Sequence, residues 1–143
     1  MDLWNNEIVS HSLSSKRGDR MTYISGLEKL IELKKQYPEC RMILHSDQGS
    51  VYASKAFNEL LPMYEIVRSM SRAGTPTDNA AMEAINGWIK AGLFMDLHVT
   101  GELPVEKEID DYIIFFNEYR PDYSLNYMTP KQYRESNSAS PAV

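Results

Sequence analysis

The stretch from Arg41 to Asp47, Arg-Met-Ile-Leu-His-Ser-Asp, decides the fold, because a short apolar run ends there in a carboxylate. Such a run is typical of a buried strand. The run from Ile66 to Met70 predicts a second strand, and the residues between them, Ser54 to Tyr64, carry apolar side chains at helical spacing. Strands that alternate with helices predict an α/β layer with some parallel pairing. In such sheets ligands gather at the carboxyl ends of strands, where Asp47 lies.

The flanking sequence predicts two more helices and a hairpin. One helix follows Gly18-Asp19 and stops at Pro38, and the other runs from Pro104 or Val105 to Tyr119. Residues 1–13 predict two strands joined at Asn5-Asn6, since Asn tolerates the positive φ of a two-residue turn. A chain that begins inside a hairpin strand is expected to be cut. We predict one domain over residues 1–135 and a disordered tail over residues 136–143, which are rich in Ser, Asn and Ala.

A further helix begins near Asp78 and carries Glu83 in its first turn, with Thr77 or Asp78 expected as its cap. Each helical residue turns by about 100°, so Glu83 and Lys90 fall within about 20° of each other. Asn86 and Gly87 flank them, while the opposite side holds Ala81, Ile85 and Trp88. Gly87 costs about 1 kcal/mol relative to Ala, which the close approach of a ligand would explain. A solvated face with a tolerated glycine is the alternative.

Asp47 and Glu83 have 35 residues between them. A strand-end carboxylate and a helix-borne carboxylate are suitable ligands for a hard divalent cation, and such cations catalyse phosphoryl transfer on nucleic acid. Sites of this kind usually need a third acid.

Composition fits one ordinary globular domain of 143 residues. The net charge of −5 argues against binding to nucleic acid by bulk electrostatics. Basic residues nevertheless recur around the candidate site, namely Lys55, Arg68, Arg72 and Lys90. The single cysteine excludes an internal disulfide. With no secretory signal and no long apolar stretch, we expect no membrane partner and a cytoplasmic location, at the nucleoid if the chain is bound to DNA.

Several motifs together resemble a known family. Residues 45–52, His-Ser-Asp-Gln-Gly-Ser-x-Tyr, are similar to the second-aspartate motif of bacterial insertion-sequence transposases with a retroviral-integrase-like core. Residues 69–83, Ser-Met-Ser-Arg-x-Gly followed by Asp-Asn-Ala-x-x-Glu, resemble the third-acid motif of that family, and Lys90 matches its helix lysine. The closing signature is similar from Tyr112 to Pro130. The resemblance runs from about Asp2 to Arg134.

The resemblance implies a ribonuclease-H-like mixed sheet flanked by helices. It also implies an Asp-Asp-Glu triad that holds two Mg²⁺ or Mn²⁺ ions roughly 3.5–4 Å apart, for cleavage at a transposon end and transfer of the strand to target DNA. Asp47 and Glu83 would be the catalytic, metal-binding acids in this chain. Lys90, Asn86 and Arg72 would contact DNA.

The sequence departs from the family in two ways. The first aspartate of the triad lies upstream of the hairpin in the family, and Asp2 matches a position that is not a ligand. We therefore expect an N-terminally truncated core without its first strand, weakened metal sites, and a destabilised or self-associating protein. Asp122 also stands where the family usually has His, after Arg-Pro.

Simpler interpretations accompany these. Asp47 can be a turn-forming residue, His45 a structural histidine, and Trp4 and Trp88 core residues. The acids from Glu102 to Asp111 favour a solvated helix face. Three functions stay open: a transposase core fragment that is inactive or weak alone, a ribonuclease-H-like metal nuclease, and a non-catalytic nucleic-acid-binding or dimerisation fragment that modulates a full-length transposase.

Overall fold

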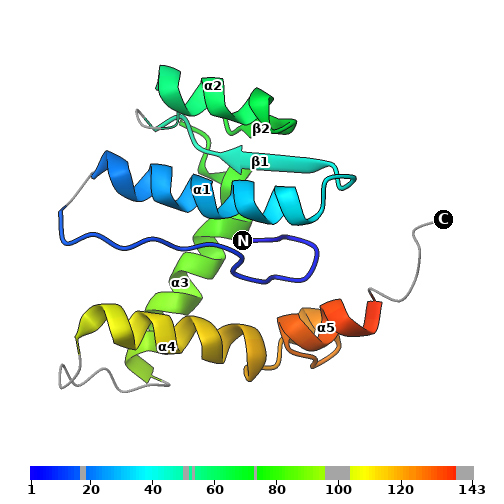
Figure 1. The fold of residues 1–143 in the computed structure, drawn as a ribbon. Helices are drawn as coiled ribbons and strands as arrows, with labels where there is room; N and C mark the ends of the chain where they lie inside the picture. The colour runs from blue at the N-terminus through cyan, green and yellow to red at the C-terminus, as the bar shows by residue number, and fades with distance from the viewer. Residues whose placement is uncertain (17–18, 50–51, 53, 73, 96–103, 138–143) are drawn as a thin grey trace. The chain divides into compact units, whose positions relative to one another are not determined.

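The computed structural model describes residues 1–16, 19–49, 52, 54–72, 74–95 and 104–137. The chain divides into two compact units, which are described separately: Ser10–Glu83, and Met1–Val9 with Ala84–Val143. Along the chain the elements are α1 (Arg20–Gln36), β1 (Met42–Ser46), α2 (Lys55–Met63), β2 (Ile66–Met70), the 3-10 helix η1 (Pro76–Asn79), α3 (Ala80–Met95), α4 (Val105–Glu118), the 3-10 helix η2 (Tyr123–Leu125) and α5 (Pro130–Asn137) (Figure 1).

The Ser10–Glu83 unit contains the predicted strand–helix–strand arrangement. β1 and β2 lie side by side as a parallel pair, with Met42 opposite Ile66 and Ser46 opposite Met70 (Figure 1). The connection between them is α2, whose first turn is capped by the Ser54 hydroxyl. Both predicted strands and the helix between them are confirmed, and Asp47 follows the carboxyl end of β1.

The core of this unit lies between α1, α2 and the sheet. Its buried side chains are Leu27 and Ile31 of α1, Phe57 and Leu61 of α2, and Ile66 of β2. The N-terminus of α1 is capped by Asp19, whose carboxylate accepts the Met21 amide hydrogen at 3.0 Å. At the other end, buried Lys34 donates to the carbonyls of Pro38 and Cys40, which holds the chain where it leaves the helix.

In the other unit, α4 buries one face, on which apolar residues recur at helical spacing. Tyr112, Ile113 and Phe116 are buried, and Tyr112 has no exposed surface. A Cβ added to Gly92 of α3 would lie only 1.8 Å from the Tyr112 hydroxyl oxygen, so glycine is what allows the ring to pack there. The predicted solvated acid face is confirmed at Glu106, Asp110 and Asp111 but wrong at Glu108, which is buried. Glu102 lies outside the described residues.

The hairpin predicted at the N-terminus is right in its turn and wrong in its strands. Asn6 has a φ of 57°, and the Asp2 amide donates to the Glu7 carbonyl at 2.8 Å. Residues 1–16 nevertheless contain no strand. The Asn117 side chain instead accepts the Ile8 N–H at 2.9 Å and donates to the Ile8 carbonyl at 3.1 Å. A side-chain amide therefore takes the two backbone groups that a neighbouring strand would use.

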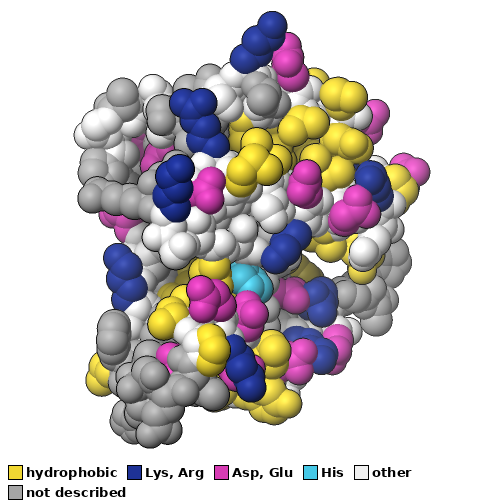
Figure 2. Space-filling view, turned by 60° about the vertical axis from the view of Figure 1, so that its left-hand side comes forward, with side chains coloured by type: hydrophobic (Ala, Val, Ile, Leu, Met, Phe, Trp, Pro, Cys, Tyr) yellow, Lys and Arg dark blue, Asp and Glu magenta, His cyan; other side chains and the backbone are white. Residues whose placement is uncertain are grey.

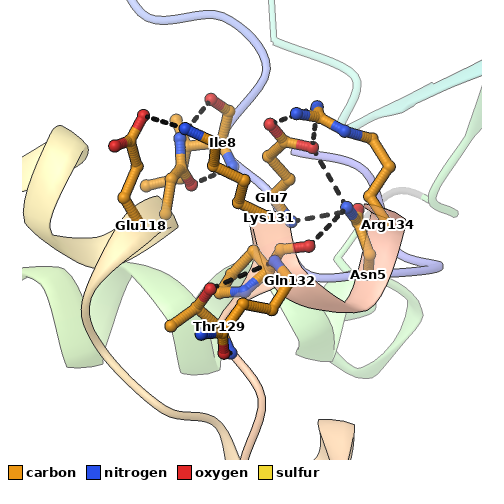
Figure 3. Close-up of polar contacts among 10 residues, drawn as sticks. Asn5, Glu7, Ile8, Glu118, Thr129, Lys131, Gln132 and Arg134 are labelled. Atoms are coloured by element: carbon orange, nitrogen blue, oxygen red, sulfur yellow. Dashed lines mark hydrogen bonds and ion pairs between the residues drawn. The ribbon is translucent and has the colours of Figure 1, made fainter. Parts of the chain in front are cut away.

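Polar contacts fix the N-terminal segment to α5 (Figure 3). The Asn5 side chain, fully buried, donates to the Pro130 carbonyl and to the Glu7 carboxylate. Arg134 donates to both carboxylate oxygens of Glu7, at 2.5 and 2.6 Å. α5 runs to Asn137, two residues past the predicted end of the domain, and residues 138–143 lie outside the described residues.

The prediction that Trp4 and Trp88 are core residues is wrong. Their exposed fractions are 53% and 46%. Trp4 packs edge-on against Tyr133, with ring centroids 5.3 Å apart, and the Arg120 guanidinium lies 5.9 Å from the Trp88 ring centroid. An indole can gain an aromatic or cationic neighbour on one side and keep the other in water, so apolar periodicity alone did not place these rings.

Asp122, whose role the sequence left open, is a structural cap. One carboxylate oxygen accepts the Ser124 amide and hydroxyl at 2.8 and 2.7 Å, and the other accepts from Asn6 at 3.0 Å. Burial acts to raise the pKa of this carboxyl, but the hydrogen bonds from Ser124 and Asn6 outweigh it, so the pKa lies below its ordinary value. Asp122 thereby stabilises the start of η2.

None of the helices in the described part of the chain is long and apolar enough to cross a membrane.

Candidate functional site

Asp47 lies in a turn at the end of β1, and its side chain is exposed. Its Oδ1 atom accepts the Gly49 amide hydrogen at 2.8 Å, so the turn-forming interpretation of Asp47 is confirmed. A Cβ added to Gly49 would lie 2.9 Å from the same oxygen, so a larger residue there would require the Asp47 carboxylate to shift. The turn presents the carboxylate at the carboxyl end of β1, which is the position predicted from the sequence.

Tyr52 lies close to Asp47 and has no role that could be assigned from the sequence. It packs edge-on against Tyr23 and Phe57, at 5.2 and 5.3 Å between ring centroids. Burial raises the pKa of the Tyr52 hydroxyl, and the nearby charges of Tyr23 and Asp47 add to the effect. The tyrosine therefore stays a neutral phenol beside the carboxylate and connects it to the core of the unit.

Glu83 lies in the first turn of α3 with its side chain exposed. Asn86, Gly87 and Lys90 follow on the same face of the helix, and all three are exposed. Nothing lies within 4 Å of a Cβ added to Gly87. Asp47 and Glu83 belong to the Ser10–Glu83 unit, whereas Asn86 and Lys90 lie past its boundary on the same helix. The face predicted from helical spacing is thus open to solvent.

His45 is a structural residue, as predicted. One ring nitrogen, Nδ1, lies 2.9 Å from the Ser69 hydroxyl, and the other, Nε2, lies 3.1 Å from the Ser71 hydroxyl. The Ser46 hydroxyl donates instead to the Asp47 carbonyl, so no His–Ser–Asp triad forms among these three neighbours. The histidine, two residues before Asp47, thus connects the carboxyl ends of β1 and β2.

Arg72 and Asp78 form a bidentate ion pair in the loop that leads from β2 to α3. Arg72 Nε donates to Asp78 Oδ2, and Nη2 donates to Oδ1, each at 2.9 Å. The Arg72 backbone amide also donates to Oδ2 at 2.9 Å. These side-chain and backbone hydrogen bonds, with a smaller contribution from His45, lower the pKa of Asp78 to about 2.

The expected capping of the α3 region by Thr77 or Asp78 is wrong. The 3-10 helix η1 precedes α3, the residue at its N-cap position is Thr75, and no side chain caps it. Asp78 cannot serve as a cap because its two oxygens are taken by Arg72. The sequence signal that could have predicted this contact is an arginine and an aspartate on either side of the turn-forming residues Gly74-Thr75-Pro76.

The other basic residues near the candidate site differ in how accessible they are to an anion. Arg68 of β2 is half-buried and donates to the Asn58 side chain, while its Nε and Nη2 atoms are buried without a hydrogen-bond partner in the described part of the chain. Lys55 is exposed and lies 3.6 Å from Glu59. In Figure 2, acidic side chains are interspersed with basic ones on the visible face. Binding of an anion would therefore depend on individually placed groups and not on a broad positive field.

Asp47 and Glu83 carry the type of donor atom that a divalent cation prefers, but two acids are fewer than such a site usually needs. Carboxylate oxygens are the donors that Mg²⁺ prefers. Within residues 1–16, 19–49, 52, 54–72, 74–95 and 104–137, no three His, Cys, Asp or Glu side chains are grouped to hold a metal ion. The described residues alone therefore do not supply a full set of ligands for such an ion.

Comparison with known proteins gives a consistent result. Residues 64–130, which include Glu83 and Lys90, match the family described as Integrase core domain. The chain is 33% identical, over 96% of its length, to the transposase for insertion sequence element IS904 from Lactococcus lactis subsp. lactis (strain IL1403), and covers 54% of that protein. It is 32% identical, over 94% of its length, to InsK of insertion sequence element IS150 from Escherichia coli (strain K12), and covers 46% of it. The chain thus spans about half the length of these relatives.

Solved structures show the same fold. The HTLV-2 integrase catalytic core domain in complex with magnesium, in its trimeric form, aligns with a TM-score of 0.69 at 22% identity, covering 93% of this chain and 80% of that one. A chain of the simian T-cell lymphotropic virus intasome in complex with PP2A regulatory subunit B56 gamma aligns with a TM-score of 0.73 at 21% identity, covering 90% of this chain and 45% of that one. The predicted ribonuclease-H-like α/β class is confirmed. Residues 64–130 therefore match an integrase core domain, and the chain is similar over most of its length to bacterial insertion-sequence transposases.

Proposed function

We propose that this chain contributes to DNA transposition or integration, with Asp47 and Glu83 as the acids that bind a divalent cation. The observation that carries the proposal is the pair of exposed carboxylates, one at the carboxyl end of β1 and one in the first turn of α3. The relatives of the chain include a transposase for an insertion sequence element. Bound Mg²⁺ or Mn²⁺ would activate an attacking oxygen and stabilise a leaving one during phosphoryl transfer.

The acidic residues of the site would bind the metal ion, and the basic and amide residues would contact DNA. Asp47, held in its turn by Gly49, and Glu83 would supply oxygen ligands to the ion. Lys90 and Asn86, on the open face of α3, would contact the DNA backbone, and Arg72 would do so from the loop after β2. Because no group of three or more His, Cys, Asp or Glu side chains occurs among the described residues, we expect the ion to bind weakly to this chain alone.

Calorimetric titration with Mn²⁺ tests the metal site. We expect a weak binding isotherm that Asp47→Asn and Glu83→Gln each abolish. Glu59→Gln is the matched control, since it removes an exposed carboxylate of the same unit. An isotherm that survives Asp47→Asn would refute Asp47 as a ligand. Tight binding of two ions that requires Asp47 would refute the expected weakness of the site.

Fluorescence anisotropy with a labelled DNA duplex tests the DNA face. Loss of one phosphate contact weakens binding and lowers the slope of log K against log salt by about 1. We expect this result for Lys90→Gln, and a weaker affinity for Asn86→Ala. Lys107→Gln, on the exposed side of α4, is the control and is expected to leave the slope unchanged. Equal effects of Lys90→Gln and Lys107→Gln would contradict a specific role for Lys90.

Activity assays separate the remaining functions. Cleavage of DNA by this chain alone, abolished by Glu83→Gln, would favour a metal nuclease. Association with a full-length transposase in the absence of metal would favour a modulating fragment. Strand transfer that requires both Asp47 and Glu83 is the result expected of a transposase core.

A further inference from the structure

Within the described part of the chain, the Arg72–Asp78 pair leaves one edge of the guanidinium without a hydrogen-bond partner. A guanidinium has five N–H donors. Asp78 takes the Nε donor and one donor of Nη2, and 78% of the Arg72 side chain is exposed. The edge formed by Nη1 and the second donor of Nη2 therefore faces away from Asp78. Two parallel N–H groups on such an edge match two oxygens of a phosphate.

The pair is anchored to the same strand ends that carry Asp47. Arg72 follows Ser71, whose backbone amide donates to the Ser46 carbonyl at 3.0 Å and whose hydroxyl contacts His45. Asp78 lies in η1, directly before the helix that carries Glu83. Asp78 Oδ2 also accepts the Arg72 backbone amide, so the carboxylate fixes both the main chain and the side chain of Arg72.

We propose that Asp78 is a positioning residue that holds the Arg72 guanidinium as a preformed site for one phosphate of the DNA backbone. This inference rests on the proposed function and adds to it a residue that would not itself touch DNA. A flexible arginine must lose side-chain entropy to bind a phosphate, and a guanidinium already fixed by a bidentate partner loses less. The low pKa of Asp78 keeps the partner ionised over the whole range in which DNA binding is measured.

Charge alone makes the opposite prediction, which allows a decisive experiment. Replacing Asp78 by Asn removes a negative charge, so simple electrostatics predicts tighter DNA binding by Asp78→Asn. Positioning predicts weaker binding, because the guanidinium loses its fixed orientation. The control is Glu32→Gln, which removes one charge from an exposed carboxylate of the same unit, 2.6 Å from Lys35.

The experiment measures the affinity of the full chain for a labelled DNA duplex by anisotropy at several salt concentrations. We expect Arg72→Gln to lose about ten-fold in affinity, the equivalent of one charge-assisted hydrogen bond, and about 1 in salt slope. Asp78→Asn is expected to approach Arg72→Gln in both quantities, while Glu32→Gln binds as tightly as the wild type or slightly more tightly. Arg72→Lys keeps the charge but lacks the fork, so it is expected to resemble Arg72→Gln.

A double mutant separates positioning from general support of the loop. If Asp78 acts only through Arg72, then Asp78→Asn has no further effect in the Arg72→Gln background. An equal loss in both backgrounds would show a merely structural role and overturn the inference. Tighter binding by Asp78→Asn, or wild-type binding by Arg72→Lys, would also overturn it while DNA binding by the chain stands. Absence of DNA binding by the wild type would refute the proposed function and, with it, this inference.

Discussion

The side chain of Asn117 in α4 occupies both backbone hydrogen-bonding groups of Ile8, accepting from its N–H at 2.9 Å and donating to its carbonyl at 3.1 Å. We expect Asn117→Ala to lower the free energy of unfolding by about 2 kcal/mol, since two hydrogen bonds are lost and their partners stay partly buried. Asn137→Ala, which removes one exposed contact to the Tyr133 carbonyl, is the control and is expected to change stability by under about 0.5 kcal/mol. Urea denaturation measures both, and equal effects would contradict this role of Asn117.

Two glycines of α3 are expected to respond in opposite ways to the same substitution. Gly92→Ala is expected to destabilise the chain by about 2 kcal/mol, because the added methyl group collides with the Tyr112 ring. Gly87→Ala is expected to stabilise it by about 1 kcal/mol, because the position is exposed and alanine favours the helix. Denaturant titration of both variants measures the difference. If Gly87→Ala also weakens DNA binding, the glycine serves the close approach of a ligand; destabilisation by Gly87→Ala would contradict the open environment of this residue.

Elements set by local sequence were predictable. β1, α2 and β2 follow from short apolar runs and from helical spacing, and Asp19 caps α1 through a contact that spans two residues. Strand pairing depends on partners far along the chain. The hairpin prediction failed in its strands because the backbone groups of Ile8 bind Asn117, 109 residues away.

In the candidate site, too, residues in local motifs could be predicted, whereas a contact that depends on the path of a loop could not. The acids Asp47 and Glu83 could be proposed from their spacing and from the resemblance of the flanking motifs, because each motif is local. The contact between Arg72 and Asp78 was missed because both residues had a plausible separate role, one as a DNA contact and the other as a helix cap. Only the path of the loop between them brings the carboxylate to the guanidinium.

Asp122 is expected to make stability depend on pH in the acid range. The pKa of its carboxyl in the folded chain lies below the ordinary value of 3.8. The carboxylate therefore contributes stability above about pH 4, and this contribution is lost as the pH falls through the lower, folded pKa. Asp122→Ala is expected to cost about 1 kcal/mol at pH 7, as the loss of a helix cap does. Thermal unfolding at pH 7 and pH 3 measures the difference between wild type and variant. A difference that grows on acidification would contradict the assignment.

Association between copies of the chain is expected through the small sheet. In the described part of the chain β1 pairs only with β2, so its outer edge is unpaired. Ile43 and Val67 are neighbours in register and are 54% and 44% exposed, so an apolar surface adjoins this edge. Unpaired edges next to apolar side chains are templates for a second strand, and a lysine at such a position opposes pairing.

Sedimentation over a range of protein concentrations tests this expectation. The wild-type chain should show a mass that rises with concentration, and Ile43→Lys should suppress the rise. Met63→Lys is the matched control, because it places the same charge on an apolar side chain that is 72% exposed at the end of α2, away from the strand edge. A wild-type monomer at every concentration, with a sharp melt that does not depend on concentration, would contradict association through β1. Equal suppression by both variants would trace the association to general surface charge and not to the edge of the sheet.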